Sequence, residues 1–447
     1  MSSSVYMLLI LLVSIVLIIF LIMKARLNAF VVLIIACIFL GLATRMPLAK
    51  IASSIEAGMG GTLGFLATVL GLGTILGKMM EVSGGAERLA RTLIGAFGRE
   101  RAHWAMLFVA FICGIPVFFQ VGFVLLLPLI FSVASAAKMP LAKIGIPVVA
   151  GLITVHCIVP PHPAAMALVG LLHADVGKVI IYGLLVGLPA AILAGPIYGS
   201  FISRHVTLNP PEKLFKTKGE DTPSESLPSF GITLVTILLP LLIMVARTII
   251  ELVASKNAPY MPFVAFIGNP ITALLLSALL SYWTLGLARG LTKADLAKLT
   301  DECFGPVAGI LLIIGAGGAF NMVILNSGMG KVIADVMTSM HLSPLIAGWI
   351  IAIVLRFAVG SSTVAMMTAG GIILPVLANY PRLDPAVLCV AVGAGAIGLS
   401  HMTDSGFWIV KEFFGMSLSD TLKTWTVSTT IAGVSGLIGV LLLSRVV

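Results

Sequence analysis

The chain is a succession of long apolar runs separated by short polar segments, with fourteen runs in all. Several runs are shorter than the ~20 residues that a straight helix needs to cross a bilayer. The short runs lie around polar clusters, which is typical of re-entrant or broken helices whose irregular backbone is shielded by protein. We therefore expect an all-α polytopic membrane protein. The runs lie near residues 5–23, 28–43, 60–80, 103–119, 122–137, 144–159, 176–201, 230–253, 264–288, 304–325, 344–359, 364–379, 386–401 and 425–445.

Two regions in opposite halves of the chain share one design. Residues 114–128 read GIPVFFQVGFVLLLP and residues 360–375 read GSSTVAMMTAGGIILP, so each begins with a Gly-containing polar or proline-bearing cluster and ends with a proline. Each is followed by a histidine-bearing polar segment, TVHCIVPPHP at 154–163 and LSHMTDSGFW at 399–408. Polar segments that break the backbone at matching positions of two halves are typical of the central binding site of a secondary transporter.

Composition agrees with this interpretation and leaves little room for soluble domains. The 447 residues are 59% apolar and only 10% charged. The formal net charge of +9 does not indicate a nucleic-acid partner, because excess Lys and Arg in a membrane protein usually marks cytoplasmic loops. The longest polar stretch, residues 204–229, is expected to be a central cytoplasmic loop between two membrane halves, 1–203 and 230–447. The partners implied by composition are the lipid bilayer and a small solute.

An internal repeat relates the two halves. A shift of 244 residues places residues 71–90 on residues 315–334 without a gap, with five identical positions of twenty, whereas Gly-rich composition alone gives about two. Other landmarks keep nearly the same offset, which strengthens the repeat. The identical positions are Gly71/Gly315, Gly73/Gly317, Ser83/Ser327, Gly84/Gly328 and Ala90/Ala334, and the landmarks are Trp104/Trp349, Pro128/Pro375 and His156/His401.

Charge indicates that the two repeats are inverted in the membrane. Segment 81–103 carries four arginines, whereas its counterpart 326–343 carries only Lys331. The positive-inside rule places the first segment in the cytoplasm and the second outside. We expect two inverted repeats with re-entrant hairpins, and both chain termini outside. Transporters of this kind are often dimers, so a homodimer is an expectation by analogy.

The start of the second hairpin is a candidate site for an anionic substrate or a sodium ion. Ser361, Ser362 and Thr363 offer hydroxyls and open amides at the beginning of a helix, the groups that such ligands use. The alternative is a small-residue helix-packing face. Arg356, one turn earlier, favours the site, because a charge inside a membrane segment usually has a function.

The two histidine segments supply further candidates for substrate contacts and proton transfer. Around His156 and His162, three prolines within four residues must open the backbone; the alternative is a structural kink with capping histidines. His401 and Thr403 accompany Asp404 in the second segment. A carboxylate in a membrane helix costs about 2.5–3.5 kcal/mol, so Asp404 is expected to couple transport to an ion, unless it faces water or pairs with Lys411.

Three other polar or backbone-breaking positions complete the predicted substrate contacts. Pro116 and Gln120 lie at the start of the first hairpin. The third is Asn321, which borders the glycines of GAGGAF together with Asn326, and interhelical hydrogen bonding is the alternative role of both asparagines.

Known catalytic motifs are absent from the sequence. It contains no HExxH, GxSxG or P-loop and no Asp-rich metal cluster, so we expect no enzyme, cofactor or metal site. Without a nucleotide-binding segment, transport must use an ion gradient or be passive. A membrane enzyme built on Asp404 and the histidines and a passive channel are the alternatives from other classes.

Seven motifs spread over nearly the whole chain are IEAGMGGTLGFLA (55–67), GLGTILGKMMEVSGGAER (71–88), HCIVPPHPAA (156–165), LLIIGAGGAF (311–320), GSSTVAMMTAGG (360–371), HMTDSGFW (401–408) and LKTWT (422–426). Together they resemble the gluconate permease family, the gluconate:proton symporters. This resemblance implies a bacterial inner-membrane importer of gluconate, a related sugar acid or, in one branch, D-serine. It also implies membership of the ion-transporter superfamily, whose known folds have inverted repeats, paired re-entrant hairpins and an elevator-like transport domain.

The chain departs from this family pattern at a few polar positions. Many gluconate members carry an acid where Gln120 stands, and they tend to have Lys and Asp where this chain has Asn321 and Asn326. The D-serine branch also has an acid in place of Gln120 and lacks a histidine equivalent to His401. We therefore expect a proton-coupled sugar-acid importer, with D-serine transport or sodium coupling as alternatives.

Overall fold

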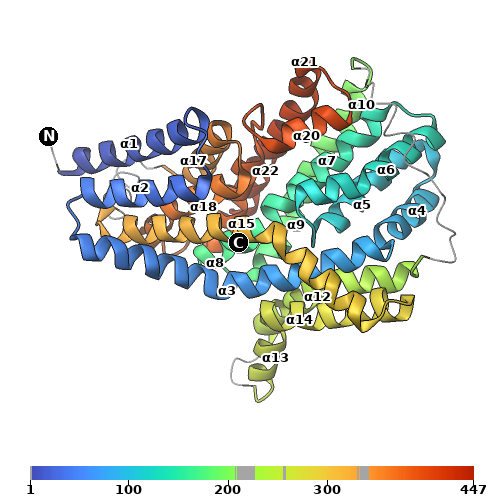
Figure 1. The fold of residues 1–447 in the computed structure, drawn as a ribbon, viewed down its shortest axis with the longest axis horizontal. Coiled ribbons are helices and arrows are strands. Elements are labelled where there is room, and N and C mark those ends of the chain that lie inside the picture. The colour runs from blue at the N-terminus through green and yellow to red at the C-terminus, as the bar shows by residue number, and fades with distance from the viewer. Residues whose placement is uncertain (1–2, 207, 209–226, 255–257, 330–331, 333–341) are drawn as a thin grey trace.

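A computed structural model describes residues 3–206, 208, 227–254, 258–329, 332 and 342–447. These residues form an all-helical fold (Figure 1). Within them, nine helices are long and apolar enough to cross a membrane, or ten if the bent pair 119–127 and 129–137 counts as one span. The prediction of an all-α polytopic membrane protein is therefore confirmed.

The first half contains the helices up to residue 202. Its α-helices are α1 (Ser3–Met23), α2 (Ala29–Ala43), α3 (Leu48–Val82), α4 (Gly85–Phe97), α5 (Ala102–Gly114), α6 (Phe119–Ala137), α7 (Leu141–Ile158), α8 (Pro163–Leu171), α9 (Val176–Ile192) and α10 (Tyr198–Ile202). A π-helical turn, η2 (Leu193–Ile197), joins α9 to α10, and a 3₁₀ turn, η1 (Arg99–Arg101), precedes α5.

The second half contains the helices from residue 230 onward. Its α-helices are α12 (Phe230–Val253), α13 (Met261–Ile267), α14 (Pro270–Ser281), α15 (Lys293–Asn326), α17 (Pro344–Val359), α18 (Ser362–Ile373), α19 (Pro385–Ile397), α20 (Ser405–Phe413), α21 (Leu418–Thr421) and α22 (Val427–Leu443). The shorter elements are η4 (Tyr282–Gly286), η5 (Leu287–Arg289), η6 (Leu374–Asn379) and η7 (Leu422–Thr426).

Two predicted segments differ from the structure. The apolar run at 60–80 is part of a longer helix, α3, which already begins at Leu48. The run 264–288 is broken between α13 and α14, because Pro270 cannot continue a helix. The Asn269 side chain caps α14 by accepting a hydrogen bond of 3.0 Å from the Ile271 amide.

The repeat found in the sequence is present in the backbone. Ser83 ends α3 and Ser327 ends α15 with the same dihedral angles, φ −78° and ψ −11°. The glycines that follow, Gly84 and Gly328, both adopt positive φ, 73° and 78°, a conformation that glycine reaches without a steric penalty. Contacts repeat as well, since α5 packs against α7 as α17 packs against α19, and α1 against α2 as α12 against α14.

The equivalent helices α3 and α15 run antiparallel, which makes the repeats inverted. The Asn326 side chain, at the end of α15, donates a hydrogen bond of 2.9 Å to Ser54 Oγ near the start of α3. Further along α3, Gly71 lies beside the Phe304 ring, near the start of α15. Figure 1 shows the two helices side by side, with α3 in blue below α15 in orange.

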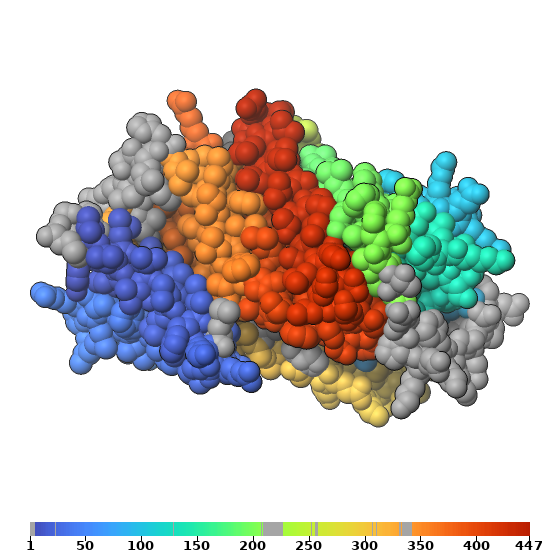
Figure 2. All heavy atoms as spheres, turned by 90° about the horizontal axis from the view of Figure 1, so that it is seen from above, coloured from blue at the N-terminus to red at the C-terminus, as the bar shows by residue number. Residues whose placement is uncertain are grey.

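The boundaries of the two halves stay a prediction. Most of the expected cytoplasmic loop 204–229 lies outside the described residues, and so do Lys331 and most of 326–343. Where the chain is described the halves interlock: in Figure 2 the C-terminal helices, in red, cross the middle of the visible face between the N-terminal helices, in blue, and green to cyan parts of the first half.

The helices α7 and α19 form the buried centre of the fold and place the two polar segments. In the apolar span 141–171, which includes α7 and α8, 94% of the most apolar window is buried. In α19 every residue from Ala386 to Ile397 is buried. The first histidine segment begins at the end of α7, and the second lies directly after α19. The core of the protein therefore brings both segments to the interior.

Candidate functional site

A central cavity of about 240 Å³ lies between the two hairpins and is lined by both repeats. This volume is smaller than the ~300–1,000 Å³ usual for sites of drug-sized ligands, so it suits a small metabolite. Seven of the predicted site residues line it. They are Gln120, His156, Ser361, Ser362, Thr363, Thr403 and Asp404.

Three helices begin at this cavity. The helices α6, α18 and α20 start at Phe119, Ser362 and Ser405, and all three residues line it. The amides of a first helical turn lack partners within the helix, and the helix dipole adds positive potential at that end. The convergence of three helix N-termini favours an anionic group in the cavity.

A fully buried ion pair closes the second-repeat side of the cavity. Arg356, at the end of α17, is 1% exposed, and Asp404 is 6% exposed. The Arg356 Nη2 atom lies 2.5 Å from Asp404 Oδ2. The alternative that Asp404 pairs with Lys411 is wrong, because Lys411 Nζ contacts Glu412 Oε1 at 2.6 Å.

Further hydrogen bonds fix the position of this pair. Arg356 Nη1 donates to the Gly360 carbonyl, and Nη2 also donates to Ser400 Oγ at 2.9 Å. The Ser400 hydroxyl donates to Asp404 Oδ2 and accepts a hydrogen bond of 2.7 Å from Trp425 Nε1. Asp404 Oδ1 caps α20 by accepting from the Gly406 amide at 2.8 Å. Both charges are thus compensated, as burial requires.

Gly360 is the one position at the hairpin tip that excludes any side chain. Its φ is +78°, and a Cβ atom there would lie 2.1 Å from the carbonyl oxygen of Thr403. The close approach brings the tip of the second hairpin onto the backbone that carries Asp404. Ser361 then caps α18 by accepting a hydrogen bond of 3.3 Å from the Val364 amide.

The first histidine segment forms the opposite wall. His156 lines the cavity, and the His162 ring lies behind it with ring centroids 4.2 Å apart. His162 Nδ1 caps α8 by accepting from the Ala164 amide at 3.3 Å, so part of its role is structural. Among the described residues, His156 Nδ1 and His162 Nε2 have no hydrogen-bond partner although both are buried.

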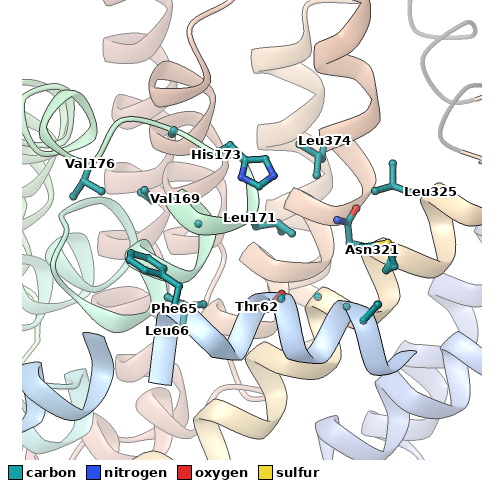
Figure 3. Close-up of a pocket in the computed structure, with 17 residues that line it drawn as sticks. Thr62, Phe65, Leu66, Val169, Leu171, His173, Val176, Asn321, Leu325 and Leu374 are labelled. Atoms are coloured by element: carbon teal, nitrogen blue, oxygen red, sulfur yellow. The ribbon is translucent and has the colours of Figure 1, made fainter. Parts of the chain in front are cut away.

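Three predicted residues lie away from the central cavity. Pro116 lines a neighbouring cavity of about 120 Å³. Asn321 lines a separate cavity of about 600 Å³, where Figure 3 shows it opposite His173 and above Thr62. The His401 ring packs against Phe357, and its Nε2 lies 2.8 Å from the Phe357 carbonyl oxygen. In this conformation none of the three lines the central cavity.

The two outer cavities are equivalent under the repeat. The smaller one is lined on α3 by Thr74, Gly77, Lys78 and Glu81, and the larger one on α15 by Gly318, Asn321, Met322 and Leu325. The second set is the first shifted by 244 residues. One member of an equivalent pair is therefore about five times as large as the other, so the structure is asymmetric where the sequence repeat is symmetric.

From the sequence, Arg356 was used as support for the site without being counted among the site residues, and Ser400 and Trp425 were not found. The signal for Arg356 was available, since it is a lone cation within an apolar helix. Ser400 and Trp425 carry no such signal, because Ser and Trp are common in membrane helices and at their ends. Among the described residues there is no group of three or more His, Cys, Asp or Glu side chains that could bind a metal.

Comparison with known proteins identifies the family. The family model described as GntP family permease matches residues 6–446. The chain is 46% identical to a gluconate permease of Pseudomonas aeruginosa over all of this chain and 99% of that one. It is 47% identical to a gluconate permease of Zymomonas mobilis, over 98% and 97% of the two chains.

Two further relatives bear on substrate and fold. The D-serine transporter DsdX of Escherichia coli is 44% identical over the full length of both chains. The crystal structure of the Alcanivorax borkumensis YdaH transporter, described as having an unusual topology, matches with a TM-score of 0.61 over 87% of each chain at 14% identity. The chain belongs to the GntP permease family and is a multi-pass inner-membrane transporter, not an enzyme.

Proposed function

We propose that this protein imports gluconate or a closely related sugar acid together with protons. The observation that carries the proposal is the central cavity, where three helix N-termini and Arg356 surround one end and side chains with hydroxyl, amide and imidazole groups line the rest. The positive end suits a carboxylate, and the polar lining suits the hydroxyls of a polyol chain. The gluconate permeases at 46% and 47% identity support the same substrate class.

D-serine is the second candidate, because a D-serine transporter is 44% identical. A zwitterion needs an acceptor for its ammonium group as well as a donor for its carboxylate. The one acidic residue that lines the central cavity is Asp404, whereas hydroxyl and amide side chains that suit a polyol make up much of the remaining lining. The described cavity therefore favours a sugar acid over an amino acid.

Transport into proteoliposomes tests the proposal directly. We expect radiolabelled gluconate to accumulate under an inward proton gradient in sodium-free buffer, and excess unlabelled sugar acids to block it. Uptake of D-serine without uptake of gluconate would contradict the substrate. Accumulation that requires sodium would support the alternative of sodium coupling through the hydroxyls of Ser361, Ser362 and Thr363.

Alternating access by sliding of the hairpins along α3 and α15 completes the proposal. On α15, Asn321 contacts Gly371, well inside α18. On α3 the equivalent residue, Gly77, contacts Pro116 and Val117 at the tip of the first hairpin. The same point of α3 and α15 therefore meets the two hairpins at different depths. The two depths differ by about two to three helical turns. A stroke on the order of 10–15 Å would exchange the registers and the sizes of the two outer cavities.

Paired cysteines test this movement. In a background without Cys37, Cys113, Cys157, Cys303 and Cys389, the pair Asn321→Cys/Gly371→Cys should cross-link in the conformation described here. In the conformation described here, nothing lies within 4 Å of a Cβ atom at Gly73. The pair Gly73→Cys/Val121→Cys should therefore cross-link only in the opposite state, after the first hairpin has moved along α3. Active transport without any cross-linking of the second pair would contradict the sliding mechanism.

A further inference from the structure

The buried ion pair between Arg356 and Asp404 stands at the positive end of the cavity. Both residues line it, and each is the other's only opposite charge among the residues that do so. Arg356 Nε is buried and has no acceptor among the described residues. The guanidinium thus has an unused donor beside the three helix N-termini that favour an anion.

An anionic substrate changes the charge balance of this pair. When a second carboxylate approaches one guanidinium, two negative groups compete for a single positive one in surroundings of low dielectric constant. Like charges at such a distance disfavour the doubly ionised state, so one carboxylate takes up a proton. Gluconate is a carboxylate that must stay ionised to bind the helix N-termini, whereas Asp404 can become neutral without leaving its position.

We infer that Arg356 binds the substrate carboxylate and that Asp404 takes up one proton when the substrate arrives. The Arg356 Nη2 contact with Asp404 Oδ2 is replaced by a contact with the substrate, and a proton from the open side of the membrane binds the released carboxylate. The empty pair and the loaded site then have the same net charge. A site with substrate alone or proton alone carries an extra charge, which opposes its movement through the membrane.

Asp404 has few neighbours that can compete for this proton. Arg356 faces it from α17, and His156 and Cys157 lie near it from α7. His401, in its own loop, faces Phe357 instead, while α6 contributes the neutral side chains of Phe119 and Gln120. Asp404 is the group among these that contacts the arginine, so substrate binding acts on it first.

The test is the number of protons taken up when gluconate binds to the purified protein. Calorimetry in two buffers of different ionisation enthalpy gives this number. For the wild type we expect about one proton per gluconate, and an affinity that falls about tenfold per pH unit wherever one proton is taken up. For Asp404→Asn we expect close to zero and a flat pH profile. Asn keeps the cap of α20, because it is as good an N-cap as Asp.

A matched control removes another ion pair. Lys178 Nζ and Asp384 Oδ2 lie 2.8 Å apart and connect the two halves, but neither residue lines the central cavity. The variant Lys178→Gln/Asp384→Asn should still take up one proton. One proton per gluconate in Asp404→Asn would overturn the inference while the proposed function stands. No gluconate binding by the wild type would overturn the proposed function, on which this inference rests.

A second variant tests the role of Arg356. Removing Arg356 alone leaves a buried unpaired carboxylate, so the charge-free variant Arg356→Gln/Asp404→Asn is the better probe of binding. Its affinity for gluconate should fall about 10- to 100-fold, as expected for the loss of hydrogen bonds to a charged group. Affinity for the uncharged analogue gluconamide should change little. Unchanged preference for gluconate over gluconamide in this variant would contradict the inference.

Discussion

The two polar segments stand at equivalent places in the inverted repeats but differ in chemistry. In the first repeat, His156 near the end of α7 packs against His162 at the start of α8, and the cavity residues nearby are uncharged. In the second, α19 leads to Asp404, which pairs with Arg356. The position equivalent to Arg356 by the 245-residue offset of the histidines is Phe111. The repeat thus duplicates the framework, while the charges belong to one half.

Because of this difference, the two sides of the central cavity are chemically unlike, although the fold repeats. The second repeat can bind a carboxylate, and the first can donate and accept hydrogen bonds through neutral groups. A buried polar atom without a partner is uncommon, so His156 Nδ1 is expected to find one in a bound molecule or water. A polyol acid would lie with its carboxylate toward the second hairpin and its hydroxyls toward the histidines.

The largest effect is expected for Arg356→Gln alone. The substitution leaves Asp404 buried without its partner, which costs about 3–5 kcal/mol of folding free energy and abolishes transport. Thermal unfolding in detergent and uptake assays measure both. Phe111→Leu, at the equivalent position of the first repeat, is the control and should cost about 1 kcal/mol. Equal effects at the two positions would mean that the charge asymmetry has no importance.

A smaller effect is expected for His156→Ala. Losing one hydrogen-bonding group to a substrate hydroxyl should weaken gluconate binding by about 2- to 10-fold. Proton uptake per gluconate should stay at one, because the proton binds in the second repeat. Equilibrium binding combined with two-buffer calorimetry gives both numbers. Loss of proton uptake in this variant would move the proton site to the histidines and remove the distinction between the repeats.

The substitution Gln120→Glu adds a carboxylate to the first-repeat side of the cavity, as Asp404 does on the second-repeat side. Gln120 is exposed and lines the cavity, so a glutamate there would repel an anionic substrate when ionised. Gluconate affinity should fall several-fold at high pH and recover at low pH, and proton uptake should exceed one per gluconate. A pH profile identical to that of the wild type would show that the first hairpin is not part of the site in the bound state.

The smallest effect is expected for the control Lys178→Gln/Asp384→Asn. This ion pair is partly exposed, and such pairs contribute about 0–1 kcal/mol to stability. Unfolding temperature and transport rate should both stay close to those of the wild type. A large loss of transport would show that charge pairs outside the cavity matter as much as the pair inside it.

Much of the fold follows from the sequence because its signals are local. Apolar run length predicts spans, and prolines and glycines predict where helices break, as at Gly360 and at 160–163. The gapless offset between 71–90 and 315–334 predicts the shared caps of α3 and α15. The start of α3 was missed, because residues 48–59 are less apolar than a membrane span although they are helical.

The site was predicted in part, and its missing parts depend on long-range contacts. The pairing of Arg356 with Asp404 joins residues 48 positions apart, and no local pattern indicates it. Asn321 and Pro116 were grouped with the central site because they lie in polar or broken segments. Which cavity they line depends on how the hairpins sit along α3 and α15, and the sequence contains no signal for that register.

A structure of the gluconate-bound protein at acidic pH is the most direct test of the account. It should place the substrate carboxylate within about 3 Å of the Arg356 guanidinium. The hydroxyls should lie toward His156, with Asp404 no longer in contact with Arg356. A carboxylate bound at the histidines, with the pair of Arg356 and Asp404 intact, would contradict the claim that the second repeat carries the anion site.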